Sequence, residues 1–166
     1  YPDMGKANVR IYGDLMYRHW DTWEDEYARH LFIVPVEGGT PIDVMEGESF
    51  QTPDPPFGGG DHIAWSPDGK EIAYTSKKVD NYEESTNTDI YVYNIASGTT
   101  TNITKGMNGF DRSPLYSPDG KWIAFNSMER AGHEADKNRL MIYNRKAGKI
   151  EELTHSLDQW VHGKVW

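Results

Sequence analysis

The chain has 166 residues, of which 17 are Lys or Arg and 26 are Asp or Glu, so its formal net charge is −9 at pH 7. This charge, with no Lys/Arg-rich stripe, argues against nucleic acid or an anionic membrane as the main partner. The chain contains no cysteine, which excludes disulfides and thiol chemistry within these residues.

An incomplete unit is predicted at the start of the chain, over residues 1–47. Two apolar runs at residues 30–36 and 42–44 are separated by glycines and threonine, a pattern typical of short strands joined by a turn. The residues ahead of them form a long insertion that ends in charged and aromatic side chains.

A repeated turn sequence marks two complete units, at residues 61–105 and 112–155. The sequence Ser-Pro-Asp-Gly-Lys at residues 66–70 returns at residues 117–121, about 50 residues later, a spacing typical of propeller blades. In such a turn proline presets φ, aspartate bonds to nearby amides, and glycine accepts a positive φ. Both copies are therefore predicted to close a tight hairpin.

Each complete unit is predicted to contain four short antiparallel strands, because apolar and aromatic runs alternate with turn residues and no window has helical periodicity. The second strand of each unit is apolar at consecutive positions, which indicates cover on both faces by neighbouring units. The predicted strands are residues 62–65, 71–77, 89–95 and 100–104 in the first unit, and 113–116, 121–128, 139–145 and 149–154 in the second.

Residues 160–166 are similar to the first strand of a further unit. The predicted fold class is therefore all-β: a partial β-propeller of four-stranded antiparallel blades, TolB- or WD40-like, with two complete blades and parts of two others. Because propellers typically close with four to eight blades, we expect residues 1–166 to be a single fragment of a larger propeller. The exposed blade faces and unpaired strand edges of such a fragment predict self-association.

Three insertions, at residues 18–23, 80–88 and 128–136, occupy the same topological place, between the second and third strands of a unit. Since antiparallel strands alternate in direction, all three are expected to emerge on one side of the blades. Loops on a rigid scaffold usually carry binding residues, so this side is the candidate functional surface. The candidate substrate-binding residues are Arg18, His19, Trp20, Asp21, Trp23, Glu129 and Arg130.

The chemistry of these side chains leaves two interpretations open. Arg18 and Asp21, with the tryptophans beside them, suit the grip of peptide termini, or they form a structural ion pair covered by aromatic rings. Glu129 and Arg130 suit an ammonium and a carboxylate or carbonyl respectively, or they form a surface ion pair.

The sequence predicts no cofactor and no metal site. His133 lacks the second histidine of a zinc helix, and the acidic loop at residues 80–89 fits no defined calcium spacing. The chain also contains no Gly-x-Ser-x-Gly nucleophile elbow and no phosphate-binding glycine loop. We therefore expect no catalysis from these residues alone.

Taken together, the repeats and insertions resemble the propeller domain of prolyl-oligopeptidase-type serine peptidases, in the branch of the acylaminoacyl and dipeptidyl peptidases. The repeats alone are shared with TolB-like propellers, and the insertions sharpen the resemblance. The segments that carry it are Tyr-Arg-His-Trp-Asp-Thr-Trp at 17–23, His-Leu-Phe at 30–32, Pro-Pro-Phe-Gly-Gly-Gly-Asp at 55–61, Ser-Met-Glu-Arg at 127–130 and Glu-Ala-Asp-Lys-Asn-Arg-Leu at 134–140.

The resemblance implies a two-domain enzyme, in which an α/β-hydrolase domain absent from these residues carries a Ser-Asp-His triad and the propeller gates short peptides. It strengthens the substrate-binding interpretation of the insertions and favours a periplasmic over a cytoplasmic location. The paired glutamates by which some dipeptidyl peptidases hold a substrate amino terminus have no clear counterpart, so a free or acylated terminus stays open. The rival hypothesis is a stand-alone TolB-like binding module.

Overall fold

The computed structural model describes residues 9, 11–13, 15–24 and 27–166; the other residues of the unit predicted at 1–47 lie outside this description. The described chain consists of short strands and one 3₁₀ turn, η1 (Gly60–His62). None of its helical residues forms a segment long and apolar enough to cross a membrane. The strands are β1 (Arg18–His19), β2 (Thr22–Trp23), β3 (Phe32–Ile33), β4 (Ile42–Asp43), β5 (Ile63–Trp65), β6 (Glu71–Ser76), β7 (Asp89–Asn94), β8 (Thr99–Asn102), β9 (Asp111–Tyr116), β10 (Trp122–Ser127), β11 (Arg139–Asn144) and β12 (Lys149–Glu152).

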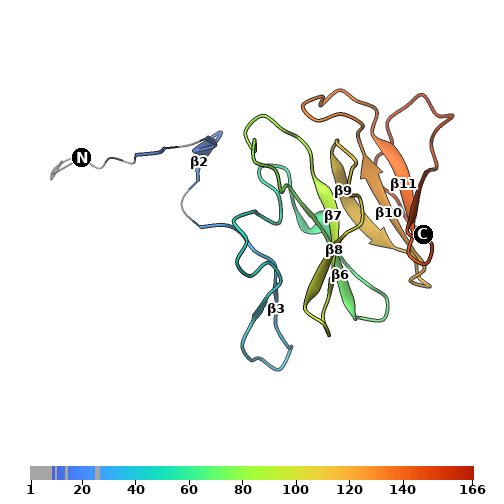
Figure 1. The fold of residues 1–166 in the computed structure, drawn as a ribbon, viewed down its shortest axis with the longest axis horizontal. Coiled ribbons are helices and arrows are strands. Elements are labelled where there is room, and N and C mark those ends of the chain that lie inside the picture. The colour runs from blue at the N-terminus through green and yellow to red at the C-terminus, as the bar shows by residue number, and fades with distance from the viewer. Residues whose placement is uncertain (1–8, 10, 14, 25–26) are drawn as a thin grey trace.

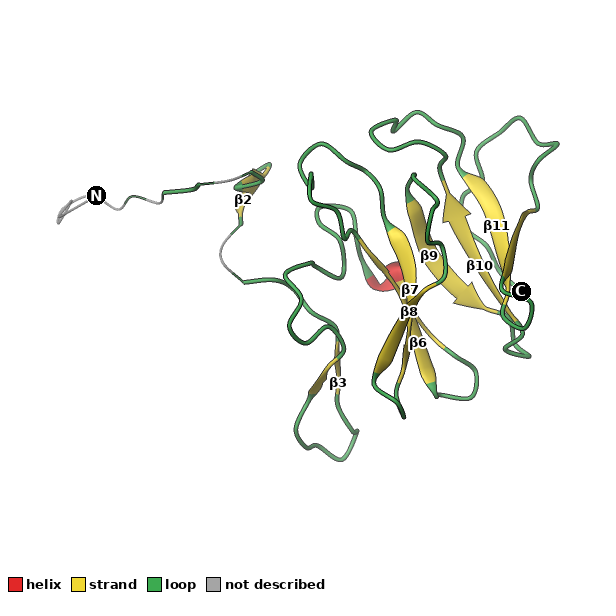
Figure 2. Cartoon of the chain, viewed as in Figure 1, coloured by secondary structure: helices red, strands yellow, loops and turns green. Residues whose placement is uncertain are grey.

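Two four-stranded antiparallel sheets form the body of the molecule, in the orders β5-β6-β7-β8 and β9-β10-β11-β12 (Figures 1 and 2). Each strand pairs with the next along the chain, and the observed bounds differ from the predicted ones by two residues or fewer at each end. Strands β3 and β4 form a short antiparallel hairpin at the place where part of a further blade is expected. The prediction of an all-β partial propeller is confirmed.

The repeated turns form by the hydrogen bonds that their sequence predicts. In the first turn the Ser66 hydroxyl donates to Asp68 Oδ1 at 2.8 Å and accepts from the Glu71 amide at 2.9 Å. In the second, the Ser117 hydroxyl donates to Asp119 Oδ1 at 2.7 Å. The glycines at 69 and 120 have φ of 69° and 68°, which only glycine adopts without steric cost. In both turns the serine and aspartate side chains therefore close the hairpin by hydrogen bonds within the turn itself.

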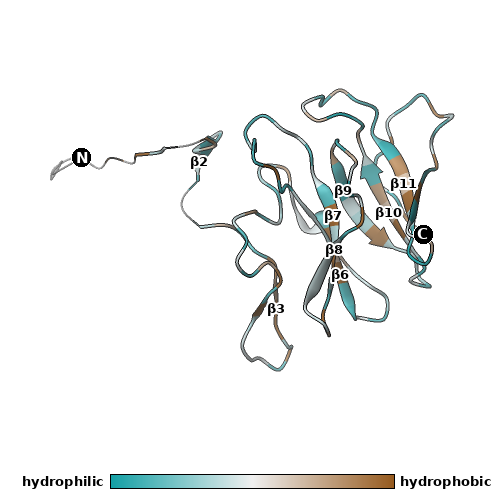
Figure 3. Cartoon of the chain, viewed as in Figure 1, coloured by the Kyte–Doolittle hydropathy of each residue, from teal (hydrophilic) through white to brown (hydrophobic). Residues whose placement is uncertain are grey.

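A hydrophobic core joins the two sheets face to face. Ala73 and Ile90 of the first sheet pack in one cluster with Ile123, Phe125 and other side chains of the second. Figure 3 shows apolar stretches on β9, β10 and β11, and these strands contribute Tyr116, Phe125 and Met141 to the cluster. Burial of these side chains removes a large apolar surface from water, which is the main force that holds one blade against the next.

The opposite face of the first sheet is covered as well. Tyr74 and Tyr91 pack there with Val44 and Met45, which follow the β3–β4 hairpin. In β6 every residue after Glu71 is buried, and β10 is buried over the same positions. The prediction that the second strand of each blade is covered on both faces is confirmed.

The two sheets are fastened at both ends. At the turn end, Arg145 donates to Glu71 and to the Gly120 carbonyl, and the Tyr116 hydroxyl donates to Glu71 at 3.3 Å. At the other end the contact is main chain to main chain: the Thr88 amide donates to the carbonyl of Gly109 at 3.1 Å. A side chain at Gly109 would overlap the main chain at Met128, so glycine is required there.

Residues 160–166 form no strand, in contrast to the prediction. The Val161 amide donates to the Asn138 carbonyl at 2.9 Å, and the Trp166 indole donates to the Leu115 carbonyl at 3.3 Å. A strand needs a paired neighbour, and no other segment of the described chain lies beside this one as a ladder. The segment instead covers the outer face of β10, where Asn126 donates to the Val161 carbonyl at 3.2 Å.

Candidate functional site

The β1–β2 hairpin and the loops after β6 and β10 meet around one cavity of about 660 Å³. These are the three insertions, and the prediction that they gather on one side of the blades is confirmed. The Gly132 amide in the third insertion donates to the Thr86 hydroxyl in the second at 2.9 Å, so the two loops are joined directly. The cavity is our candidate functional site.

The β1–β2 hairpin presents Arg18, His19 and Trp20 to this cavity. Trp20 lies at the hairpin tip with a φ of 48°, a left-handed conformation that is unusual for a bulky residue. Its ring meets that of Phe57 edge to face, with the centroids 5.8 Å apart, yet the side chain is 69% exposed. The Arg18 guanidinium donates to the Trp20 carbonyl, which holds the tip in place.

Two other predicted residues of this hairpin lie away from the cavity lining. Asp21 is exposed at the tip, and Trp23 stacks on Tyr12 with ring centroids 5.8 Å apart. His19, which does line the cavity, is held by Glu24 at 3.2 Å. The structure therefore brings together three of the five hairpin residues, and it shows no ion pair between Arg18 and Asp21 among the described side chains.

Glu129 and Arg130 also lie outside the cavity lining. Arg130 pairs with Asp136 across its own loop, where Nε donates to both carboxylate oxygens at 3.1 Å and the main-chain amide donates to Oδ2 at 2.9 Å. These hydrogen bonds raise the pKa of Arg130 and lower the pKa of Asp136. The geometry matches the ion-pair interpretation, with Asp136 in place of Glu129 as the partner, and the pair shapes the loop that carries Gly132 and Glu134.

Sequence reasoning missed a polar cluster on the wall of the cavity. The Tyr82 hydroxyl donates to Asp54 Oδ1 at 2.8 Å, and the Lys77 ammonium lies 4.1 Å from the centre of the Tyr82 ring. Burial raises the pKa of Asp54 and lowers the pKa of Lys77, because both charges are partly removed from water. Asp54 immediately precedes the Pro-Pro-Phe segment that carries the family resemblance, which was the available signal.

The cavity combines charges of both signs with aromatic surface. Three cations, Arg18, Lys77 and Arg112, face four carboxylates in its lining. Such an arrangement suits a ligand that carries an ammonium group and apolar side chains, as a short peptide does. Within the described residues no group of three or more His, Asp or Glu side chains could hold a metal ion. The carboxylates are Asp54, Glu83, Glu84 and Glu134, and the aromatic residues are Trp20, Phe57, Tyr82, Phe110 and Trp160.

Comparison with known proteins relates this arrangement to a family. Residues 66–130 match the model of the dipeptidyl peptidase IV N-terminal region. Dipeptidyl-peptidase 5 of Porphyromonas gingivalis is 46% identical over 171 residues, an alignment that covers 100% of this chain and 25% of that protein. The chain is similar over its whole length to the N-terminal propeller region of the dipeptidyl peptidases. The family resemblance drawn from the sequence is thus confirmed.

More distant relatives of this chain are found in fungi. The probable dipeptidyl-peptidase 5 of Aspergillus niger is 28% identical over 185 residues, covering 96% of this chain and 25% of that protein. The crystal structure of TolB from Acinetobacter baumannii superposes with a TM-score of 0.51 at 26% identity, covering 76% of this chain and 26% of that one. The chain spans about a quarter of the length of the relatives it matches.

Proposed function

We propose that this propeller region gates and recognises the substrate of a dipeptidyl-type serine peptidase, and that the cavity between the three insertions receives the amino-terminal end of a short peptide. The observation that carries the proposal is that all three insertions line this one cavity. The proposal places the catalytic serine outside these 166 residues, in an α/β-hydrolase domain, because their sequence contains no nucleophile elbow.

The acidic lining supports a free rather than an acylated amino terminus. Glu83, Glu84 and Glu134 offer carboxylate oxygens to the three N–H donors of an ammonium group. An acylated terminus carries no charge and gains nothing from them. The relatives from Porphyromonas gingivalis and Aspergillus niger are named dipeptidyl-peptidase 5 and probable dipeptidyl-peptidase 5, which agrees with such a substrate.

Kinetics on the protein that contains this chain test the proposal. The substrates are a chromogenic dipeptide with a free amino terminus and its N-acetylated form. We expect the free form to be preferred, and the double substitution Glu83→Gln, Glu84→Gln to raise its KM about tenfold or more with a smaller change in kcat, because a charge-assisted interaction made on binding is lost. The matched control is Glu129→Gln, an exposed glutamate outside the cavity.

Two results would contradict this assignment. One is equal turnover of the free and acetylated substrates by the unaltered protein. The other is a KM for the double variant that equals the KM of the Glu129→Gln control.

The second candidate function is a stand-alone binding module, which the structural similarity to TolB favours. This function predicts a protein that binds a peptide or protein ligand without cleaving it. Substitution of Trp20 by Ala would then weaken binding and affect no turnover. Release of chromophore from any dipeptide substrate would decide between the two candidates.

A further inference from the structure

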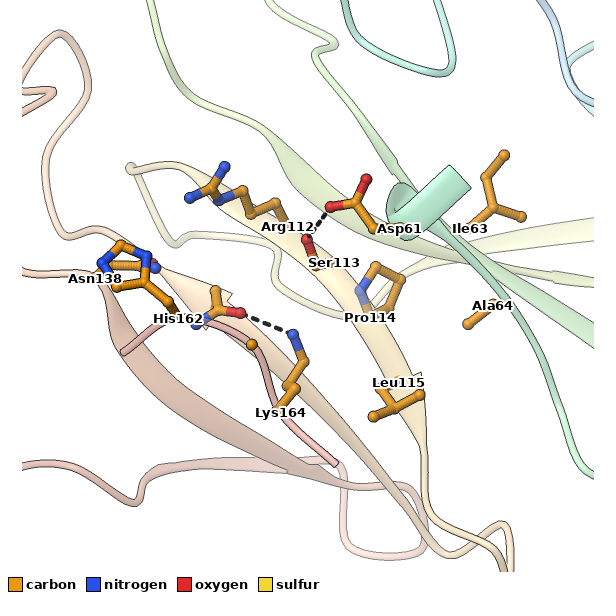
Figure 4. A pocket seen from close by; sticks show the side chains of 12 residues that line it. Asp61, Ile63, Ala64, Arg112, Ser113, Pro114, Leu115, Asn138, His162 and Lys164 are labelled. Carbon is orange, nitrogen blue, oxygen red and sulfur yellow. Dashed lines mark hydrogen bonds between the residues drawn. The ribbon is translucent and has the colours of Figure 1, made fainter. Parts of the chain in front are cut away.

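A second cavity, of about 350 Å³, lies where the first strands of the two blades meet residues 162–164 (Figure 4). Both β5 and β9 are edge strands of their sheets, and both contribute side chains to its lining. The blades of a propeller surround a central channel. Because two successive blades turn the same edge toward this cavity, it lies on the channel side of the fold.

Two cations line this cavity without a carboxylate partner of their own. Lys164 donates to Asn126 Oδ1 at 2.8 Å, and the Arg112 guanidinium lies 4.9 Å from the centre of the Phe110 ring. Among the described residues, no carboxylate oxygen lies within 4.0 Å of either cation. The one acidic residue in the lining, Asp61, accepts a hydrogen bond from the Ser113 hydroxyl at 3.0 Å.

The lowered pKa of Lys164 shows that its positive charge is unfavourable in this position. Burial, and then the nearby positive charge of Arg112, lower the pKa of Lys164 to about 8, against a smaller opposing effect of Asp61. Lys164 therefore stays protonated at neutral pH, with its charge partly withdrawn from water beside a second cation. An anion between Lys164 and Arg112 would relieve both costs.

The side-chain amide of Asn138, beside the two cations, adds a second requirement for the ligand. Asn138 lines the cavity and is 1% exposed, and its Oδ1 has no hydrogen-bond donor, while its Nδ2 donates to the Val161 carbonyl at 2.6 Å. A buried acceptor without a donor is costly. A ligand that offers an N–H donor next to an anionic group satisfies the cations and this acceptor together, and the last residue of a peptide has both.

We propose that this cavity binds the carboxyl-terminal residue of a peptide, with Lys164 and Arg112 holding its carboxylate and Asn138 Oδ1 accepting its N–H. The site is separate from the cavity between the insertions, although Arg112 lines both. This inference rests on the proposed function only in the premise that the ligand is a peptide. The proposed function concerns the amino terminus of the peptide, and this inference concerns its carboxyl terminus.

The test compares N-acetyl-tetra-alanine with its C-terminal amide, titrated by calorimetry into the protein that contains this chain. We expect the free acid to bind about tenfold more tightly than the amide, which corresponds to one charge-assisted hydrogen bond. Lys164→Met should remove this preference and Arg112→Gln should reduce it, whereas Lys164→Arg should keep part of it. The control is Lys70→Met at the far turn, where the lysine is 76% exposed.

The acetylated peptide separates this inference from the proposed function, since it carries no ammonium group. The Glu83→Gln, Glu84→Gln double variant should therefore keep the full preference for the acid, whether or not its KM for free dipeptides changes. Equal binding of acid and amide, or a preference that survives in a folded Lys164→Met variant, would overturn the inference. Displacement of the acid by inorganic phosphate at similar affinity would overturn the assignment to a peptide.

Discussion

The two ends of the blades differ in how they are built. At one end the sequence repeats, and the turns at residues 66–70 and 117–121 close on their own hydrogen bonds. At the other end the loops after β6 and β10 differ in length and composition, and their side chains meet those of other segments around a cavity. The turn end is therefore the same from blade to blade, whereas the loop end differs between blades and carries the candidate site.

Two aspartates, one near each end, differ in the direction of their pKa shift. Asp119 in the second turn is exposed, and hydrogen bonds from Ser117 and the Lys121 amide lower its pKa to about 2. Asp111, at the start of β9 near the loops, is buried, and burial raises its pKa to about 7. Neither Asp111 oxygen has a hydrogen bond of good geometry, and the partial help of the Ser127 and Thr104 hydroxyls does not offset the loss of water.

The largest effect is expected for Gly109→Ala, which places a methyl group against the Met128 carbonyl where the two blades meet. The main chain on both sides must shift, so we expect a loss of about 3 kcal/mol in the free energy of unfolding. Thermal unfolding followed by circular dichroism measures it. Gly60→Ala is the matched control, since open space surrounds that position, and equal unfolding midpoints for the two variants would show that the loop end tolerates displacement.

Asp111→Asn should stabilise the protein at pH 8 and have little effect at pH 4. The raised pKa means that the parent residue contributes stability that is present below about pH 4 and is lost as the pH rises through about 7. Asparagine cannot ionise, so we expect a gain of about 2 kcal/mol at pH 8. Denaturant unfolding at the two pH values measures the difference.

Asp119→Asn, at the turn end, should change stability at pH 8 in the opposite direction from Asp111→Asn. Because the pKa of Asp119 is lowered, its stabilising contribution is present above about pH 4 and is lost as the pH falls through about 2. We therefore expect this variant to be less stable than the parent at pH 8. If the free energies of unfolding of the Asp111→Asn and Asp119→Asn variants changed with pH in the same direction relative to the parent, the proposed difference between the two aspartates would be wrong.

Ser66→Ala and Ser117→Ala should each cost about 1 kcal/mol, because each hydroxyl donates to the aspartate two residues further on and accepts from the amide five residues further on. The two serine hydroxyls share no hydrogen-bond partner, so the double variant should show the sum of the two losses. Urea unfolding of the three variants measures this. A difference above about 1 kcal/mol between the single variants would mean that the turns are not independent units.

Trp20→Ala should have the smallest effect on stability, less than about 1 kcal/mol, because its side chain is 69% exposed and loses one ring contact with Phe57. The same substitution should weaken peptide binding if the cavity between the insertions is the site. A large loss of stability with unchanged binding would assign Trp20 to the scaffold.

The repeating end could be predicted from the sequence in detail because its interactions are local. The spacing of the turn motif located the strands, and the consecutive apolar residues of β6 and β10 predicted that both faces are covered. At the varying end, the sequence predicted on which side of the blades the three insertions gather, but it did not predict which side chains meet there. The partner of Arg130 is Asp136, six residues further on, and no pattern distinguishes it from Glu129, the neighbouring carboxylate.

The features that could not be predicted from the sequence depend on contacts between residues far apart along the chain. Tyr82 meets Asp54 from 28 positions away along the chain, and Arg112 lines both cavities through the packing of one blade against the next. Neither contact has a periodicity that a sequence could display. The segment at 160–166 has the composition of a strand, yet strand formation depends on a partner as well as on composition.

The link between Glu71, Tyr116 and Arg145 has a consequence for how blades find their order. Two hairpins of such similar sequence could pack against each other in either order, because an apolar core by itself does not distinguish the two orders. Trp122, Trp65 and Ile95 stand at the equivalent places of the other copy of the repeat, and those side chains cannot rebuild the ionic clasp. Exchanging the two copies of the repeat would therefore remove this ion pair and its hydrogen bond, so the contact favours the observed order of the two blades.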